Sequence, residues 1–216
     1  MNASKRPRVL LADDHRMVAE GLMSLLAPEF ELVGVVENGR ALVEEAKRLR
    51  PDVIVADISM PQLNGIEAMA QLKEQNREVR VVFLTMHQEV AYARRALDAG
   101  ASEYVLKHSA PAELVAAIRA ALEGKTYVTP ALAGEVLLDM SREPAGARDP
   151  VASLTPRQRQ ILQLLAEGRS AKEIGEELGI SSRTVEFHKY QLMEALDIHT
   201  SAELIHFAIK HGIVEI

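Results

Sequence analysis

The strongest constraint on the fold of this chain is the regular alternation of apolar runs and amphipathic stretches over its first 123 residues. Runs rich in valine, isoleucine and leucine predict buried strands, among them residues 8–12, 52–56, 80–84 and 103–106. Amphipathic stretches with helical spacing occupy residues 15–26, 39–49, 64–75, 89–99 and 111–122. This alternation is typical of a parallel sheet covered by helices on both faces. We therefore expect residues 7–123 to form a doubly wound α/β domain with five strands in the order 2-1-3-4-5.

The alternation stops after Glu123, and the rest of the chain divides into two parts. Residues 124–153 contain Pro130, Pro144 and Pro150 and predict a linker, with a short helix at 131–140 that could pack on either neighbour. From residue 154 the pattern is all-helical, with expected helices at 156–167, 171–178, 182–196 and 201–211. Capping boxes that begin at Thr155, Ser170 and Thr200 support three of these starts. We expect residues 154–216 to be an all-α four-helix domain.

The composition of the chain limits its expected cellular location and its expected binding partners. The 216 residues include no cysteine, which excludes disulfides and thiolate metal sites. No apolar run approaches the ~20 residues of a membrane span, and Asp13 and Asp14 interrupt the only run where a signal peptide would lie. A cytoplasmic protein with no membrane partner is expected. From Leu154 onward there are 7 Lys and Arg against 9 Asp and Glu, so any DNA binding must depend on local charge placement and on salt.

Polar side chains stand directly after four of the apolar runs. They are Asp13, Asp14, Asp57, Thr85 and Lys107. Sites in open α/β sheets form outside the carboxyl ends of the strands, so these side chains should meet in one pocket. Three carboxylates, a hydroxyl and an ammonium suit a Mg²⁺ ion and a phosphoryl group. The plainer alternative is that each aspartate only caps a turn or a helix.

Within this pocket each residue has an expected role. Asp57 is the candidate nucleophile, because a carboxylate can accept a phosphoryl group. Asp13 and Asp14 would bind Mg²⁺, with Asp57 and the backbone carbonyl of Ser59 completing the ligands. Lys107 would pair with one phosphoryl oxygen, and Thr85 could hydrogen-bond another. The Asn64-Gly65 pair beyond Asp57 predicts a tight turn.

Residues 8–123 resemble the receiver domain of two-component response regulators, which has a flavodoxin-like fold. The matching segments are Leu11-Ala12-Asp13-Asp14-His15, Ala56-Asp57-Ile58-Ser59-Met60-Pro61, Leu84-Thr85-Met86 and Tyr104-Val105-Leu106-Lys107. The resemblance implies that Asp57 takes phosphate from a sensor histidine kinase. It also implies that Thr85 and Tyr104 couple phosphorylation to a surface change, with Tyr104 swinging inward.

Three further positions follow from the same resemblance. Ser59 and His87 would line the water path to the phosphate and tune its lifetime, although both could equally be solvated loop residues. His108 stands where many receivers have proline. The isomer of the 107–108 peptide bond is therefore open, since a non-proline cis bond costs about 2.5–4 kcal/mol.

The second and third helices of the C-terminal part have the proportions of a helix-turn-helix. In the third helix Val185, Leu192 and Leu196 share one stripe and should face the core. The opposite stripe carries Arg183, Glu186, Phe187, Tyr190 and Glu194. The two aromatic residues could contact thymine methyl groups in the major groove, or pack on the receiver or on another subunit. Three more residues could contact phosphates, namely Thr184, His188 and Lys189.

The C-terminal part resembles the LuxR-type DNA-binding domain. The resemblance rests on Leu154-Thr155-Pro156-Arg157-Gln158-Arg159-Gln160-Ile161-Leu162, on Ile174–Ser181 and on Thr184-Val185-Glu186-Phe187-His188-Lys189. A receiver followed by this domain is the layout of NarL/FixJ-type transcription regulators. The resemblance implies base contacts at Glu186, Phe187 and Tyr190, where several relatives have lysine at two positions. It also implies a homodimer on double-stranded DNA, paired through the last helix, with half-sites about one turn apart.

Three interpretations follow, and the first is favoured. In it the receiver shields the recognition helix until Asp57 is phosphorylated, so the chain is a phosphorylation-controlled transcription factor and not an enzyme. In the second the chain is a metal-dependent phosphohydrolase, but Ser59 stands where many such enzymes have a second aspartate. In the third the receiver is a dimerisation module that works without phosphate, which leaves the acidic set unexplained.

Overall fold

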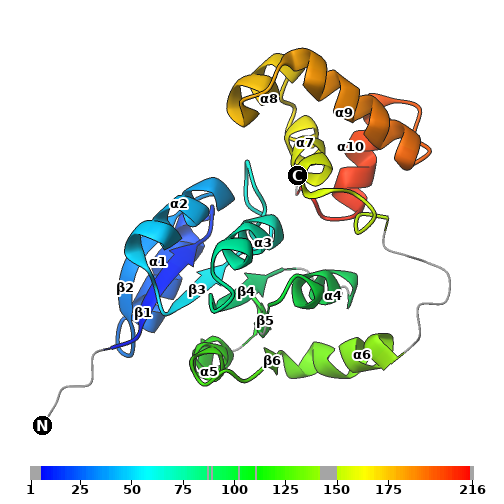
Figure 1. Cartoon of the computed structure of the whole chain (residues 1–216). Coiled ribbons are helices and arrows are strands. Elements are labelled where there is room, and N and C mark those ends of the chain that lie inside the picture. Colours follow the sequence, from blue (N-terminus) through cyan, green and yellow to red (C-terminus); the bar gives the residue numbers. More distant parts are fainter. Residues whose placement is uncertain are drawn as a thin grey trace, which may run out of the picture. The chain divides into compact units, whose positions relative to one another are not determined.

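The computed structural model describes residues 6–86, 88, 90–101, 103–109, 111–141 and 150–214, and Figure 1 shows the arrangement of the elements. Contacts divide the chain into two compact units, with the main break between Glu143 and Pro144. Residues 142–149 of the expected linker lie outside the described residues. Within the described part of the chain, no helix has the length and apolar character needed to cross a bilayer.

The N-terminal unit is built on a parallel sheet of six strands in the order β2-β1-β3-β4-β5-β6. The strands are β1 (Arg8–Ala12), β2 (Glu31–Val36), β3 (Val53–Ala56), β4 (Val81–Thr85), β5 (Glu103–Leu106) and β6 (Tyr127–Val128). Strands β3, β4 and β5 are buried along their whole length, which explains why they read as continuous apolar runs. The predicted doubly wound sheet and the order of its first five strands are confirmed.

The prediction of five strands is wrong by one, because β6 adds a sixth at the edge beside β5. This strand has only two residues, too few for a hydrophobic period to be recognised. The following Thr129 fastens it to the sheet. Its backbone N–H donates to the carbonyl of Tyr104 at 2.9 Å, and its Oγ1 accepts from the N–H of Leu106 at 3.2 Å.

The described residues of this unit form six helices. They are α1 (Arg16–Leu26), α2 (Gly39–Leu49), α3 (Gly65–Gln75), α4 (Val90–Asp98), α5 (Pro111–Leu122) and α6 (Pro130–Ser141). Helices α1 and α5 share one core cluster with alternate residues of the central strands, such as Val9, Val53 and Val82. The intervening residues point to the opposite face, where α2 contacts β1 and α4 contacts β5.

Helix α6 confirms the short helix expected within residues 131–140 and decides which part of the molecule it belongs to. It contacts α4 and buries Leu132 and Val136, so it is part of the N-terminal unit. Its Leu137 and Leu138 are exposed. Much of the segment expected to be a linker is therefore structured.

The C-terminal unit consists of helices α7 (Pro156–Ala166), α8 (Ala171–Leu178), α9 (Ser182–Ala195) and α10 (Ser201–Lys210). All four begin at the expected residue, and three end one residue earlier than expected. The three predicted capping boxes are present at Thr155, Ser170 and Thr200. The helices enclose a separate core, which includes Ile161, Leu162, Ile174, Val185, Leu192, Leu204 and Ala208.

A glycine allows α8 to lie close to the turn that leads into α9. A Cβ atom added at Gly175 would lie 2.7 Å from the carbonyl oxygen of Ile180 and 3.2 Å from the amide nitrogen of Ser182. Gly179 ends α8 in the left-handed conformation, with φ of 66°, a region that suits glycine. The sharp turn between α8 and α9 thus depends on two glycines. Gly175 allows the close approach, and Gly179 adopts the left-handed conformation.

Candidate functional site

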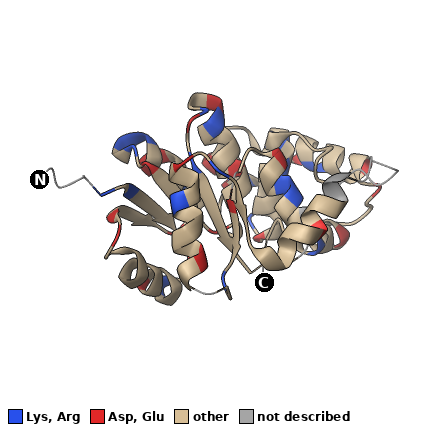
Figure 2. Cartoon of the chain, turned by 90° about the horizontal axis from the view of Figure 1, so that it is seen from below, with Lys and Arg blue, Asp and Glu red and all other residues tan. Residues whose placement is uncertain are grey.

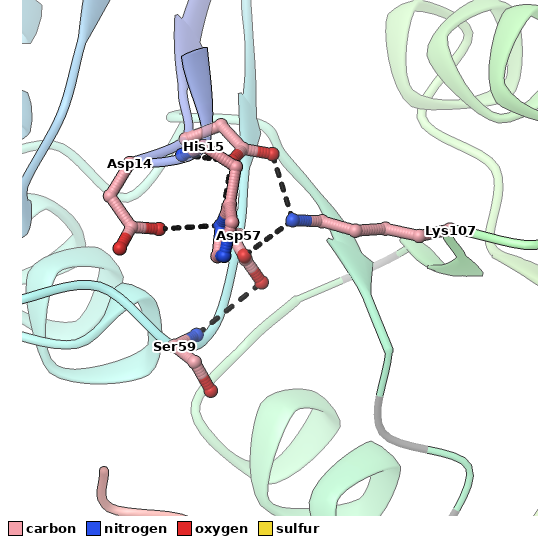
Figure 3. A network of polar contacts seen from close by, with 6 residues as sticks. Asp14, His15, Asp57, Ser59 and Lys107 are labelled. Carbon is pink, nitrogen blue, oxygen red and sulfur yellow. Dashed lines mark hydrogen bonds and ion pairs between the residues drawn. The ribbon is translucent and has the colours of Figure 1, made fainter. Parts of the chain in front are cut away.

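The loops that follow β1, β3 and β5 bring three charged side chains together at the carboxyl edge of the sheet (Figure 3). Asp13 follows β1, Asp57 follows β3 and Lys107 follows β5. The Nζ atom of Lys107 lies 2.9 Å from Oδ2 of Asp13 and 2.6 Å from Oδ2 of Asp57. The side chains of all three are nearly buried, so one ammonium bridges two carboxylates away from bulk water.

Backbone hydrogen bonds extend the sheet into this pocket. The N–H of Asp57 donates to the carbonyl of Ala12 at 2.8 Å, and the N–H of Lys107 donates to that of Thr85 at 2.8 Å. The N–H of Asp13 donates to Val36 at 3.0 Å. Because each reactive residue continues the hydrogen-bond ladder of a buried strand, the pocket is held by the sheet itself.

The start of α3 supports the loop that carries Asp57. A Cβ atom added at Gly65 would lie 2.2 Å from the carbonyl oxygen of Asp57, closer than any side chain can approach. Asn64 is the N-cap of α3 and accepts from the N–H of Glu67 at 3.0 Å. The tight turn predicted at Asn64-Gly65 is therefore wrong, because this pair begins a helix. The left-handed residue of the loop is Gln62, with φ of 67°.

Lys107 remains an ammonium in this setting. Burial alone would lower the pKa of Lys107, but the charges of Asp57 and Asp13 and the hydrogen bonds to them outweigh burial and raise the pKa. The pocket therefore keeps one fixed positive charge at physiological pH. Such a charge favours an anionic group beside Asp57.

Four side chains could hold a divalent cation. Asp13, Asp14, His15 and Asp57 each offer one ligand atom, and these atoms all lie within 4.8 Å of one another. Oδ1 of Asp14 is buried and faces Nδ1 of His15 at 3.0 Å in an ion-pair contact, while no hydrogen bond of regular geometry reaches it among the described residues. A cation would satisfy this oxygen, and a set rich in carboxylates suits a hard ion such as Mg²⁺.

His15 was not among the ligands expected from the sequence. Its signal is its position directly after the two aspartates, where its backbone N–H donates to Oδ1 of Asp13 at 2.9 Å. The N–H of Ser59 donates weakly to Oδ1 of Asp57 at 3.4 Å (Figure 3). The role of the Ser59 carbonyl as a ligand stays a prediction.

Thr85 and Tyr104 lie inside the same unit. Thr85 ends β4, Tyr104 lies in the neighbouring β5, and both side chains are fully buried. The ring of Tyr104 is therefore inside the unit in this structure, and its expected coupling to Thr85 stays a prediction. The 107–108 peptide bond, left open by the sequence, is trans. His87 lies outside the described residues.

The second candidate site is the outer face of α9. Val185 and Leu192 are fully buried against the C-terminal core, as expected. Phe187 is 58% exposed and Tyr190 66% exposed on the opposite side. Arg183 and Glu194 are also exposed, whereas Thr184, Glu186, His188 and Lys189 are half-buried.

Charge around this face is mixed. α9 carries Arg183 and Lys189 beside Glu186 and Glu194, and Figure 2 shows basic and acidic residues interspersed along the chain as a whole. Lys189 lines a hollow of about 50 Å³ with residues of α7 and α10, including Leu165, Ser201 and Ile205.

Comparison with known proteins supports both assignments. Residues 9–119 match the response regulator receiver domain family, and residues 152–208 match the luxR family of bacterial regulatory proteins. The chain is 34% identical to the response regulator UvrY of Escherichia coli over 95% of its own length and 94% of that protein. It is 39% identical to the transcriptional regulatory protein MctR of Rhizobium johnstonii over 98% of each chain.

Solved structures agree with the sequence comparison. RcsB from Salmonella enterica serovar Typhimurium, bound to a promoter in the presence of phosphomimetic BeF₃⁻, is 27% identical. The alignment covers 94% of this chain and 98% of that chain, with a TM-score of 0.64. The converging strand ends, the exposed helix-turn-helix face and these relatives lead to one conclusion: the chain belongs to the NarL/FixJ-type two-component response regulators.

Proposed function

We propose that Asp57 accepts a phosphoryl group from a sensor histidine kinase in the presence of Mg²⁺, and that phosphorylation promotes dimeric binding to DNA. The ion pairs of Lys107 with both Asp13 and Asp57 are the observation that carries this proposal. In support of this, Asp57 is a buried carboxylate with a cation beside it, and it belongs to a group of side chains that could hold a metal ion. The regulated process is transcription, as in the relatives.

The transfer needs little from the protein beyond position and charge. A carboxylate oxygen of Asp57 forms a bond to phosphorus while the bond from phosphorus to an imidazole nitrogen of the kinase breaks. The electron pair of that bond stays on the imidazole, which takes up a proton. Lys107 pairs with a phosphoryl oxygen, and Thr85 hydrogen-bonds another.

The acidic residues have a separate task. Mg²⁺ held by Asp13, Asp14 and Asp57, with the carbonyl of Ser59, would neutralise charge on the incoming group. Asp14 suits this role, because its buried Oδ1 has an ion-pair contact with His15 but no regular hydrogen bond among the described residues. Ser59 and the loop around it would set how readily water reaches the acyl phosphate.

Phosphorylation would control the C-terminal unit through the receiver. We expect the unphosphorylated receiver to restrain α9, and the phosphorylated form to release it and dimerise through α10. Thr85 and Tyr104, buried in adjacent strands, would couple the phosphate to the surface of the receiver. Phe187, Tyr190 and Glu186 would then face bases, with Arg183, Thr184, His188 and Lys189 near phosphates.

The intact mass of the full chain after incubation with acetyl phosphate and Mg²⁺ tests the acceptor. One phosphoryl adduct is expected on the wild type and none on Asp57→Asn. Asp98→Asn is a matched control, because this carboxylate is exposed on α4 and pairs only loosely with Arg94, at 3.7 Å. An adduct that persists in Asp57→Asn would reject Asp57 as the acceptor.

The same samples separate the alternatives. Tighter binding of duplex DNA by the phosphorylated wild type than by Asp57→Asn supports control by phosphate. Equal binding by both would favour a receiver that acts without phosphate. Sustained turnover of small phosphate esters would favour a phosphohydrolase.

A further inference from the structure

The exposed face of α9 carries two large aromatic side chains. Phe187 and Tyr190 are both more than half exposed, although Val185 and Leu192 on the same helix are fully buried. Their exposure is therefore a property of the outward face and not of a loosely packed helix. Large exposed apolar side chains that lie together mark a surface that binds something.

α9 offers few basic side chains for contacts with guanine. The helix has two basic residues, Arg183 and Lys189. Lys189 is half-buried and lines the hollow beside α7 and α10. Arg183 remains as one exposed donor at the start of the helix, while Glu194 adds negative charge on the same face. Contact with guanine, which arginine and lysine supply, has few candidates here.

We infer that Phe187 and Tyr190 bind the C5-methyl groups of two thymines in each half-site of the operator. This inference rests on the proposed function, because it takes α9 as the helix that enters the major groove. Of the four bases only thymine presents an apolar group in that groove, and aromatic side chains contact it well. Duplex DNA is thus recognised at these two positions through apolar contacts.

The spacing of the two rings predicts the spacing of the two thymines. Phe187 and Tyr190 are three residues apart on the helix, which places them about 4.5 Å apart along its axis. Successive bases of one strand rise by about 3.4 Å. The two thymines should therefore occupy neighbouring or next-neighbouring base steps.

Replacement of thymine by deoxyuridine tests the inference, because it removes only the methyl group. Duplexes that bind the full-length chain are first selected from a random library, with the protein treated with acetyl phosphate and Mg²⁺. Each thymine of one half-site is then replaced in turn, and affinity is measured by fluorescence anisotropy. At two positions we expect binding to weaken about fourfold, the value of one buried methyl group.

Variants assign each methyl group to a ring. In Phe187→Ala the penalty for deoxyuridine should disappear at one position, and in Tyr190→Ala at the other. Phe187→Leu keeps an apolar side chain and should retain the penalty. Leu137→Ala is the control, since Leu137 is 68% exposed on α6 of the N-terminal unit, and its loss should leave both penalties unchanged. Circular dichroism establishes that each variant is folded.

The outcomes separate this inference from the proposed function. If neither the treated nor the untreated protein selects any duplex, both fail. If a duplex is selected but deoxyuridine is tolerated everywhere, or the penalties survive in both alanine variants, the inference alone fails. Loss of oligomeric state in Phe187→Ala, without any effect of deoxyuridine, would assign the rings to a protein interface instead.

Discussion

The acceptor pocket of the N-terminal unit and the outer face of α9 are assembled in opposite ways. The pocket unites side chains from separate strand ends, and Asp57 and Lys107 are 50 residues apart in the chain. The face of α9 comes from a single helix of 14 residues. In the pocket the charges are buried and depend on one another, whereas the α9 side chains are exposed. Substitutions should therefore have coupled effects in the pocket and independent effects on α9.

Removal of Lys107 should have the largest effect on stability. In Lys107→Met two nearly buried carboxylates, Asp13 and Asp57, lose their shared cation. Breaking a buried ion pair from one side costs about 3–5 kcal/mol. Urea unfolding without divalent cations should show this loss, and added Mg²⁺ should reverse part of it.

An exposed lysine gives the contrast. Lys125 pairs with Glu123, and both side chains are well exposed. Lys125→Met should change stability little, because exposed ion pairs are screened by water. Equal effects of the two substitutions would contradict the view that the pocket is a coupled buried network.

Substitution of Gly65 should have the next largest effect. In Gly65→Ala the new Cβ would meet the carbonyl oxygen of Asp57, a backbone atom that cannot move without displacing the acceptor. Overpacking of this kind costs about 1–3 kcal/mol. We expect a lower unfolding midpoint together with slower phosphorylation of Asp57 by acetyl phosphate.

Gly21→Ala is the matched control. Gly21 lies within α1, and a Cβ there meets nothing within 4 Å. Replacing an exposed glycine within a helix by alanine stabilises by about 0.5–1 kcal/mol. If Gly65→Ala also stabilised the chain, the close approach of α3 to Asp57 would be wrong.

The two regions also differ in how much of them could be predicted from sequence. Capping boxes are local patterns of four residues, so the starts of α7, α8 and α10 could be placed without knowing the fold. The pocket could be predicted because parallel strands end at one edge. That argument predicts that Asp13, Asp57 and Lys107 are neighbours, and the structure confirms it.

The features that sequence reasoning missed depend on tertiary contacts. Strand β6 is two residues long and exists because Thr129 bonds to the backbone of β5. Asn64-Gly65 has the composition of a turn, but the approach of α3 to Asp57 makes it a helix start. Local patterns do not contain this information.

Removal of the N-cap of α10 should lower stability by a smaller amount, and the loss should be confined to that helix. Thr200 accepts from the N–H of Glu203 at 3.2 Å at the start of α10. Thr200→Ala should cost about 1 kcal/mol, the usual value of an N-cap. Hydrogen exchange should show faster opening of α10 and no change in the N-terminal unit.

Ser182→Ala is the control for Thr200→Ala. Ser182 is exposed at the first position of α9, next to the N-cap Ser181. Ser182→Ala should stay within about 0.5 kcal/mol, as is usual for surface substitutions. Altered hydrogen exchange of the N-terminal unit in Thr200→Ala would contradict the expectation that this cap stabilises α10 alone.

The smallest expected effect is the pH dependence of the same cap. The backbone N–H groups of His199 and Thr200, which donate to Glu203 at 2.8 and 3.1 Å, lower the pKa of Glu203 below its ordinary value of 4.5. A carboxylate with a lowered pKa in the folded state stabilises that state above its unfolded pKa. This stabilisation is lost as the pH falls through the folded pKa.

Hydrogen exchange of α10, measured at a series of pH values and corrected for the intrinsic rate, tests this expectation. Protection of α10 should decline in the wild type below about pH 4.5, where Glu203 begins to take up a proton. In Glu203→Gln the decline should be weaker, because glutamine keeps an acceptor but does not titrate. The lowered pKa of Glu173, caused by its hydrogen bonds to Ser170, provides the same comparison at the start of α8. An identical pH profile in wild type and Glu203→Gln would show that the charge on this cap does not contribute, and that α10 is held by packing alone.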